Sequence, residues 1–257
     1  MTKTALIGGA SRGIGYACAR ALAGSGHQIV MCARHSDALE ESAASLRALS
    51  SASVHSIATD LSSAEGHRTL GADLAARGLN VDVLVNNIGG PRPGTVAELT
   101  EADWSEGINQ LFTSTLRLYA LVIPGMKARQ FGRIVNILST TAVEPAATLA
   151  ISSVVRAALA AYAKLTAIEV AAAGVTVNSL MPGALLTART QELLRDRAAR
   201  EARPVDAVRA ELEGAFPMRR FLELDELGRI VAFLASPDAS AISGELIAVD
   251  GVQMRSI

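Results

Sequence analysis

The sequence predicts an α/β protein with a seven-stranded parallel sheet and helices on both faces. Seven short apolar segments rich in β-branched residues alternate with longer helical patterns, which is typical of a doubly wound sheet. Each short segment is apolar almost throughout, as a strand buried on both faces requires. The length of 257 residues suits one such domain, so we expect a single domain over residues 1–257.

The expected strands follow one another at intervals that leave room for a helix between them. Right-handed crossovers between parallel strands place these helices on both faces of the sheet. The strands are expected at TALIG (4–8), QIVMC (28–32), VHSIA (54–58), VDVLVNN (81–87), RIVNIL (133–138), VTVNSL (175–180) and ELIAVD (245–250).

One charged helical stretch, residues 188–216, interrupts this alternation before the last helix and strand. Its position suggests a lid over a substrate pocket. Acidic and basic residues alternate along it at spacings of three or four, so we interpret its charges as a solvated face and not as an anion-binding surface.

The composition excludes several classes of protein. Half of the residues are hydrophobic, which excludes a disordered chain, and only 4% are aromatic, so Ala, Val, Leu and Ile must build the core. The net charge is −1 and the basic residues are dispersed, so no nucleic-acid partner is expected. There is no cationic apolar leader and no uninterrupted apolar run long enough to cross a bilayer. We expect a cytoplasmic protein without a membrane partner.

A glycine-rich turn, GGASRGIG at residues 8–15, joins the first strand to the first helix. Gly9, Gly13 and Gly15 allow a tight turn and the close approach of a pyrophosphate to the helix N-terminus. The spacing differs from the usual G-x-G-x-x-G pattern, but the position after a strand in a strand–helix series favours a dinucleotide cofactor.

In these features the sequence resembles the short-chain dehydrogenase/reductase family, in particular its reductases similar to 3-oxoacyl-carrier-protein reductases. The resemblance covers essentially the whole chain and implies a Rossmann-like fold. Gly8 stands where the family usually has threonine. The motifs that carry the resemblance are GGASRGIG at 8–15, Asp60 in ATDLS, NNIG at 86–89, Asn109 in DWSEGINQ, Ser139 in GRIVNILS, PGALLT at 182–187 and SGELIAVDG near the end.

The resemblance implies that Asp60 contacts the adenine ring, and that the nicotinamide end lies against the segment from Pro182 to Thr187. Two ordinary structural roles stay open: Asp60 can cap a helix that starts near Ser62, and the Pro182–Gly183 pair can be a simple turn. The expected cofactor-binding residues are Gly9, Ser11, Arg12, Gly13, Ile14, Gly15, Arg34, Asp60, Leu61, Asn86, Gly89, Arg156, Pro182, Gly183 and Thr187.

Charge at the end of the second strand favours NADP(H) over NAD(H). An acidic residue there would bind a free 2′-hydroxyl, whereas a 2′-phosphate requires cations. Ala33 occupies that position, Arg34 follows it, and Arg12 lies in the glycine-rich turn. Two guanidinium groups can bind a phosphate in forked geometry. In the alternative, Arg34 stacks on the adenine and either cofactor binds.

The catalytic residues depart from the family's pattern. The resemblance implies a tyrosine that protonates the carbonyl, a lysine four residues later, a serine thirteen residues upstream and an asparagine that anchors a water. Ser139 and Asn109 stand at the serine and asparagine positions, but Ser152 and Arg156 replace the tyrosine and the lysine. Tyr162 lies nearly three turns further along the same helix and cannot take the tyrosine's place.

These replacements remove the usual proton donor. A serine hydroxyl does not titrate in the accessible range, and arginine stays protonated, so Arg156 can hold positive charge but cannot pass on a proton. Loss of a general acid lowers a rate by roughly 10² to 10⁴. Glu144, in a loop that should line the pocket, is the best replacement acid; alternatively it is a solvated loop carboxylate.

Three functions are compatible with this arrangement. In the first, which we prefer, Ser139 and Ser152 hold a ketone or 3-oxoacyl oxygen and Arg156 stabilises its developing negative charge. In the second, an enone accepts hydride at carbon while Arg156 and Ser139 stabilise the enolate. In the third, the protein is a nucleotide-binding sensor without turnover. The first two require a small-molecule substrate.

Neither the cysteines nor the histidines indicate a further chemical site. Cys18 and Cys32 lie in an apolar helix and an apolar strand without the spacing of metal ligands, so no metal site is expected. All four histidines fall in the cofactor half, away from the pocket, so a histidine base is not expected: His27, His35, His55 and His67.

The segment 157–173 is rich enough in alanine to pack closely against a second copy. The resemblance implies a dimer or tetramer built on this helix and on the helix that contains Asn109. We therefore expect a homodimer or homotetramer with twofold symmetry. Burial within one subunit is the competing explanation for the alanines.

Overall fold

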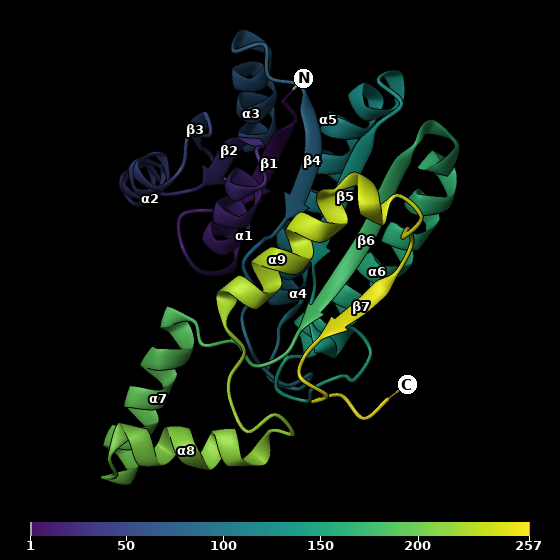
Figure 1. Cartoon of the computed structure of the whole chain (residues 1–257). Helices are drawn as coiled ribbons and strands as arrows, with labels where there is room; N and C mark the ends of the chain where they lie inside the picture. Colours follow the sequence, from purple (N-terminus) through teal and green to yellow (C-terminus); the bar gives the residue numbers. More distant parts are fainter. Residues whose placement is uncertain (1, 257) are drawn as a thin grey trace.

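A seven-stranded parallel sheet forms the centre of the computed structural model, which describes residues 2–256 (Figure 1). Neighbouring strands pair in parallel in the order β3-β2-β1-β4-β5-β6-β7. The expected doubly wound fold is confirmed. The strands are β1 (Thr4–Gly8), β2 (Gln28–Ala33), β3 (Val54–Ala58), β4 (Val81–Asn86), β5 (Gly132–Ile137), β6 (Val175–Pro182) and β7 (Leu246–Val249).

β1 and β3 have the expected ends, and the other strands differ from the expected bounds by at most two residues at an end. β6 continues beyond Leu180 to Pro182, because Pro182 pairs with Val249 of β7 and the next backbone N–H, of Gly183, donates to the Val249 carbonyl at 3.0 Å. Such pairing joins segments that are far apart in the sequence, so local patterns do not locate the last strand residue.

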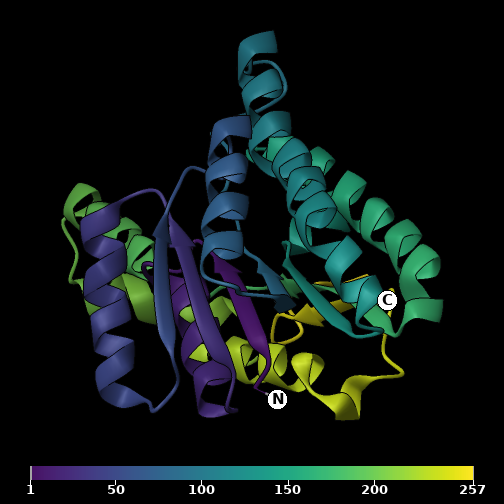
Figure 2. The same ribbon diagram turned by 90° about the horizontal axis from the view of Figure 1, so that it is seen from above.

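Helices cover both faces of the sheet (Figure 2). One face carries α1 (Gly13–Gly24), α2 (Ser36–Leu49) and α9 (Leu224–Ala235). The other carries α3 (Ala64–Ala76), α5 (Ser114–Ala128) and α6 (Ala150–Val170). The short helix α4 (Glu101–Ile108) joins α5 through a π-helical turn, Asn109–Thr113. Short 3₁₀ turns lie at Thr140–Ala142, Ala171–Ala173 and Pro237–Ala239.

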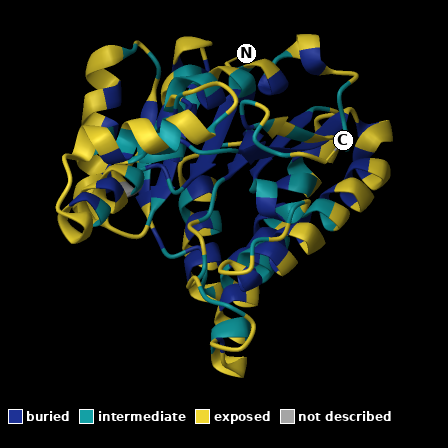
Figure 3. Cartoon of the chain, turned by 90° about the horizontal axis from the view of Figure 1, so that it is seen from below, coloured by how far each residue is buried: buried dark blue, intermediate teal, exposed yellow. Residues whose placement is uncertain are grey.

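The sheet separates two hydrophobic cores, because successive side chains of a strand point to opposite faces. Leu6 of β1 packs on the α5 side with Tyr119, and Ile7 packs on the α1 side with Leu22. Full burial of an aliphatic side chain of this size stabilises the fold by about 1.5–3 kcal/mol. Figure 3 shows the buried strands in the interior and the exposed outer faces of the helices around them.

The order of the strands reverses between β1 and β4. In sheets of this kind a ligand binds at the carboxyl ends of the strands, at the point of reversal. The glycine-rich turn follows β1, and the segment 86–89 begins at the last residue of β4. The topology therefore brings the two motifs together.

The charged segment forms two helices, α7 (Ala188–Glu201) and α8 (Val205–Ala215), which project from the carboxyl edge of the sheet (Figure 1). They have a small core of their own, formed by Leu194, Ala198, Val208 and Phe221. Their charged side chains pair with one another at the surface; Arg197, for example, lies 2.5 Å from both Glu201 and Glu211.

The segment that leads into this pair of helices and the segment that follows it are hydrogen-bonded to each other. The backbone N–H of Leu186 donates to the Leu222 carbonyl at 3.0 Å, and the N–H of Leu222 donates to the Ala184 carbonyl at 2.9 Å. We call residues 188–216 the lid segment. It is joined to the body of the protein by this pairing and by the packing of Phe221, Ala184 and Leu186 on its small core.

One helical segment, Ala150–Ala173, is long and apolar enough to cross a membrane by length and composition. The sequence predicted no uninterrupted run of this kind, because three charged residues lie within it: Arg156, Lys164 and Glu169. Half of its most apolar window is buried in the structure, where α6 packs on β6. A core helix of a globular domain meets the same criterion.

Candidate active site

The glycine-rich turn has the conformation that its sequence predicts. Gly9 and Gly13 have φ angles of +58° and +60°, in the left-handed region that favours glycine. A Cβ atom at Gly15 would lie 2.3 Å from the Gly9 carbonyl oxygen, so α1 packs directly on the turn. Arg12 occupies the N-cap of α1 without a side-chain cap. The first turn of α1 holds no acidic residue and can receive a phosphate.

The other residues expected to bind the cofactor near this turn either line the pocket or hold the turn in place. The Ser11 carbonyl accepts a hydrogen bond from the Ser42 hydroxyl at 2.6 Å, which ties the turn to α2. Ile14 lines the pocket described below, and Leu61 is buried against Gly8. The support by Ser42 was not predicted, because no local pattern connects α2 with the turn.

At the end of β2, Ala33 is half-buried and Arg34 is exposed. Neither Arg34 nor Arg12 takes part in an ion pair within the described chain. Arg34 lies close enough to Asp60 to help lower the pKa of that carboxyl group. The structure thus places both predicted guanidinium groups around the turn.

Asp60 lies just after β3, and its carboxylate closes a tight turn. Its Oδ1 accepts hydrogen bonds from the backbone N–H and the hydroxyl of Ser62, at 2.9 and 2.8 Å. Burial alone would raise the pKa of Asp60, but these bonds and the charge of Arg34 outweigh it and the pKa is lowered. The cap of α3 is Ser63, whose hydroxyl accepts from the Gly66 N–H, so the alternative role of Asp60 as that helix cap is wrong.

Asn86 faces away from the expected adenosine site. Its Nδ2 donates to Asn136 Oδ1 at 2.9 Å and to Thr115 Oγ1 at 3.0 Å in the buried core. The neighbouring Asn87 instead reaches the glycine-rich turn, where its Nδ2 donates to the Gly8 carbonyl at 3.1 Å. Asn87 was missed, although alternation along β4 was the signal that two neighbouring asparagines point in opposite directions. The Gly89 carbonyl accepts from Gln110 at 2.9 Å.

A pocket of about 350 Å³ opens at the carboxyl ends of β5 and β6. It brings together three predicted catalytic residues, Ser139, Ser152 and Arg156, with residues predicted at the nicotinamide end. We call it the substrate pocket. Its lining consists of Ile14, Leu138, Ser139, Ser152, Arg156, Pro182, Gly183, Ala184, Leu185, Thr187 and Thr190.

Among the side chains that the structure describes, Arg156 is the only charged one that lines this pocket. Its side chain is 8% exposed, its Nη1 donates to the Ile137 carbonyl at 2.9 Å and its Nε donates to the Ser152 hydroxyl at 3.2 Å. No carboxylate among residues 2–256 pairs with it. Burial lowers the pKa of Arg156 to about 10, so the guanidinium is still charged at pH 7.

Hydroxyl groups continue from Arg156 to Ser139. Ser152 Oγ lies 3.5 Å from Thr141 Oγ1, and Thr141 Oγ1 donates to Ser139 Oγ at 3.1 Å. If each hydroxyl donates to the next, the proton of Ser139 is left to bind a ligand oxygen. Thr141 is buried and was not predicted; its signal was its position two residues after Ser139.

Neither Ser152 nor Ser153 caps α6. Leu149 is the N-cap, without a side-chain cap, and both serines lie within the helix. The Ser153 hydroxyl donates to the Leu149 carbonyl at 2.9 Å and accepts from the Ala146 N–H at 3.2 Å, so it holds the preceding loop. Ser152 is left facing the pocket.

Asn109 is not brought to the substrate pocket. It is exposed, and its Nδ2 donates to the Ser62 carbonyl at 2.8 Å, on the side of Asp60. In the same π-helical turn Leu111 is the inward side chain, packed with Leu138 and Ile151. An extra residue in the helical turn changes the direction of the side chains around it, so the sequence alone does not give the direction of Asn109.

Glu144 does not have the environment of a proton donor. Its Oε1 accepts hydrogen bonds from the backbone N–H groups of Ser256 and Arg255, at 2.6 Å each. These bonds lower the pKa of Glu144, whereas an acid that works near pH 7 needs a raised pKa. The structure therefore contradicts the role of Glu144 as a replacement acid.

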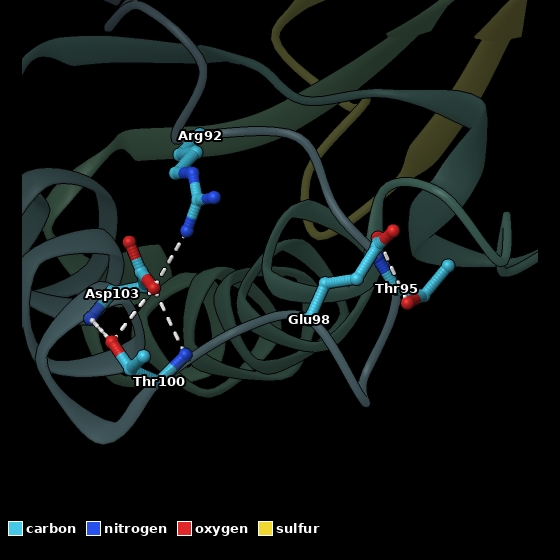
Figure 4. A network of polar contacts seen from close by, with 5 residues as sticks. All are labelled: Arg92, Thr95, Glu98, Thr100 and Asp103. Carbon is cyan, nitrogen blue, oxygen red and sulfur yellow. Dashed lines mark hydrogen bonds and ion pairs between the residues drawn. The ribbon is translucent and has the colours of Figure 1, made fainter.

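In the loop after β4, Arg92 points toward α4 and pairs with Asp103 (Figure 4), with Nη1 2.8 Å from the carboxylate. Thr100 and Asp103 form the capping box of α4, and Glu98 accepts hydrogen bonds from Thr95 in the same loop. Hydrogen bonds from the backbone and hydroxyl of Thr100, with the Arg92 contact, lower the pKa of Asp103 to about 2.

A larger hollow of about 640 Å³ lies between α1 and α9 and contains none of the predicted site residues. It is open and lined mainly by charged side chains, several of them paired, such as Arg20 with Asp225 and Arg220 with Glu226. Its size alone gives it no chemical role, and the smaller pocket remains the candidate site.

Comparison with known proteins identifies the family of the chain. A family model described as short chain dehydrogenase matches residues 3–198. The chain is 31% identical to the NADPH-dependent reductase BacG of Bacillus subtilis over 99% of both chains. It is 34% identical to the acetoacetyl-CoA reductase of Shinella zoogloeoides over 98% of this chain and 99% of the relative.

A solved structure gives the same result for the fold. The L-sorbose reductase of Gluconobacter frateurii, solved in complex with NADPH and L-sorbose, superposes with a TM-score of 0.96 at 30% identity. The match covers 100% of this chain and 98% of that one.

Proposed function

The chain belongs to the short-chain dehydrogenase family, and on that premise we propose that it is an NADP(H)-dependent reductase of a small molecule with a carbonyl group. The observation that carries the proposal is the substrate pocket, where a buried and unpaired guanidinium lies beside two serine hydroxyls. The names of its relatives support the reaction: an NADPH-dependent reductase, an acetoacetyl-CoA reductase and an L-sorbose reductase.

The glycine-rich turn supports the proposed cofactor. The free N-terminal turn of α1 would hold the pyrophosphate, and Arg12 and Arg34 would bind the 2′-phosphate, since Ala33 leaves no carboxylate at the end of β2. Pro182, Gly183 and Thr187 would lie at the nicotinamide end, because they line the substrate pocket. NAD(H) would bind more weakly through the contacts that do not involve the phosphate.

The proposed role of Arg156 is to stabilise negative charge on the substrate oxygen. When hydride from NADPH adds to the carbonyl carbon, the electron pair of the double bond moves to oxygen. A buried guanidinium held in place by hydrogen bonds stabilises that charge without rearrangement. Ser139 would hold the oxygen in place as a hydrogen-bond donor. Ser152, expected to do the same, would instead donate to Thr141 and act through the chain of hydroxyl groups.

The proton that completes the alcohol needs a source other than the missing tyrosine. None of the residues that line the pocket has a pKa near 7 as its ordinary value, and Arg156 retains its proton up to about pH 10. We assign the delivery to solvent, through the hydroxyl groups of Ser152, Thr141 and Ser139. In this scheme Thr141 is a positioning residue for Ser139.

The same pocket supports a second candidate, the reduction of a conjugated enone. Hydride then adds to the β-carbon, Arg156 and Ser139 stabilise the enolate oxygen, and carbon takes its proton from water. The observation that favours it is the combination of a permanent cation with the absence of a titrating acid among the residues that line the pocket.

Deuterium transfer separates these candidates. NADPH that carries deuterium at its transferable position is incubated with a panel of ketones and enones, and the products are analysed by NMR. We expect deuterium on the carbinol carbon. Deuterium on a carbon β to an intact carbonyl would assign the enone reaction. Tight NADPH binding with no product across the panel would mean that the protein is a nucleotide sensor.

The proposal also includes the role of the lid segment, the oligomeric state and the cellular compartment. The lid segment would cover the substrate, since Thr187 and Thr190 at the start of α7 line the pocket. A twofold homo-oligomer would bury Val154, Leu165 and Ile168 on α6, which are 57%, 67% and 69% exposed. The compartment would be the cytoplasm, as expected from the sequence.

A further inference from the structure

We propose that the segment from Asp250 to Ser256 is a strap that sets the width of the substrate pocket, and that Glu144 and Gln253 are the positioning residues that fasten it. The proposal rests on the proposed function only in its effect on the substrate. The contacts themselves join two walls of the pocket that are far apart in the sequence.

The strap begins as a tight turn built by Asp250, which is 6% exposed. Its Oδ1 accepts from the Val252 N–H at 3.0 Å, and its Oδ2 accepts from the Met254 N–H at 2.7 Å. Val252 has a φ of +65°, in the left-handed region that a β-branched residue rarely adopts. The two bonds to Asp250 hold the chain in this conformation and direct it across the end of the sheet.

Gln253 fastens the strap to the first wall. Its Oε1 accepts from the backbone N–H of Ala184 at 3.0 Å, and Ala184 lines the substrate pocket. The preceding residue is packed as closely, because a Cβ atom at Gly183 would lie 2.7 Å from the Asp250 Cα. The loop that follows β6 therefore rests directly on the strap.

Glu144 fastens the strap to the second wall. Its carboxylate accepts from the N–H groups of Arg255 and Ser256, and hydrogen bonds to a charged acceptor are stronger than neutral ones. Glu144 ends the turn that Ser139 begins: Ser139 caps the 3₁₀ turn Thr140–Ala142, and the Glu144 N–H donates to the Thr140 carbonyl at 3.0 Å. The strap thus links the loop of Ser139 to the loop of Ala184.

Besides the strands that they follow, the Ser153 hydroxyl holds the loop after β5 through the Ala146 N–H, and the Leu222 N–H holds the loop after β6 through the Ala184 carbonyl. Neither of these contacts joins one loop to the other. Release of the strap at either end would let Ser139 and Ala184 move apart and widen the pocket of about 350 Å³. A small substrate would then be held less well, and a bulkier carbonyl compound would gain access. The glycine-rich turn lies on the other side of the point where the strand order reverses. Among the described residues it makes no hydrogen bond with the strap.

The test uses Glu144→Ala and Gln253→Ala, with Glu144→Gln as the conservative variant. Glu245→Ala is the matched control, because Glu245 is an exposed carboxylate that pairs only with Lys164 in the described chain, at 3.7 Å. Hydrogen exchange followed by mass spectrometry reports on residues 139–146, 183–187 and 250–256 in the full chain. NADPH affinity and the thermal midpoint show that each variant is folded.

We expect faster exchange in all three segments of Glu144→Ala, with NADPH affinity unchanged. For the best ketone substrate KM should rise about tenfold, as expected for the loss of charged hydrogen bonds, with little change in kcat. Glu144→Gln should recover part of the effect, because its Oε1 still accepts. Gln253→Ala should act in the same direction.

If hydrogen exchange in Glu144→Ala equals that in the wild type and in Glu245→Ala, the proposal of the strap is wrong. A fall in kcat at constant KM would also overturn it and would return Glu144 to the role of an acid. If the wild-type protein reduces no substrate, the proposed function fails, whereas hydrogen exchange still decides on the strap.

Discussion

The turn after β1 and the turn after β5 lie at the same edge of the sheet, but different forces shape them. In the first, the backbone itself imposes the residue types: Gly9 has a positive φ, and Gly15 has no room for a Cβ atom. In the second, Ser139 and Glu144 are placed by side chains and by the strap. The conformation of the glycine-rich turn therefore follows from the local sequence, whereas the placement of the residues on the substrate side follows from it only in part.

The largest effect is expected on the substrate side, from Arg156→Ala. Removal of one preorganised group that stabilises an oxyanion lowers kcat by roughly 10²–10³, and NADPH affinity should fall much less. Steady-state kinetics and a fluorescence titration give the two quantities. Arg156→Lys is the control, since it keeps the charge. A loss of NADPH affinity with kcat unchanged at saturating NADPH would assign Arg156 to the cofactor alone.

The next effect is expected in the cofactor turn, from Gly15→Ala. Its Cβ would lie 2.3 Å from the Gly9 carbonyl oxygen, and overpacking of this kind costs about 1–3 kcal/mol, or roughly a tenfold to hundredfold loss of NADPH affinity. Gly24→Ala, at the other end of α1, meets no atom within 4 Å and should bind normally. Equal affinities of the two variants would show that the turn does not cradle the cofactor.

A smaller and more selective effect is expected from Arg34→Ala. Loss of a charge-assisted bond to the 2′-phosphate at an exposed position should weaken NADPH binding by about tenfold and leave NADH binding unchanged. Titration with both cofactors measures the difference. If both affinities fall together, Arg34 stacks on the adenine instead.

Thr141→Val tests the hydroxyl chain on the substrate side. The change keeps the shape of a buried side chain but removes the donor to Ser139, so kcat should fall by about fivefold to tenfold. Thr141→Ser keeps the hydroxyl and should restore most of the rate. A normal rate for the valine variant would remove Thr141 from the proton path.

The smallest effect is expected from pH between about 6 and 9. Serine hydroxyls do not titrate there, and Arg156 loses its proton only as pH rises through about 10, so kcat/KM should be level and then fall. A pH–rate profile on one substrate measures this. A step near pH 7 would reveal a titrating acid that the pocket lining does not contain.

On the substrate side, the sequence predicted the residues whose positions depend only on spacing along one helix. Ser152 and Arg156 are four residues apart on α6, so both face the pocket, and Tyr162 lies too far along the helix. It failed for Glu144, whose partner Arg255 is 111 residues away. No local pattern encodes a contact of that range.

By itself the sequence determined the seven-stranded parallel sheet, the glycine-rich turn and the replacement of the usual proton donor, since these depend on periodicity, on backbone conformation and on residue identity. Only the tertiary structure decided the directions of Asn86 and Asn109, the role of Glu144 and the link through Thr141. Those properties depend on which side chains meet when distant segments pack, and a small rotation of one turn is enough to change them.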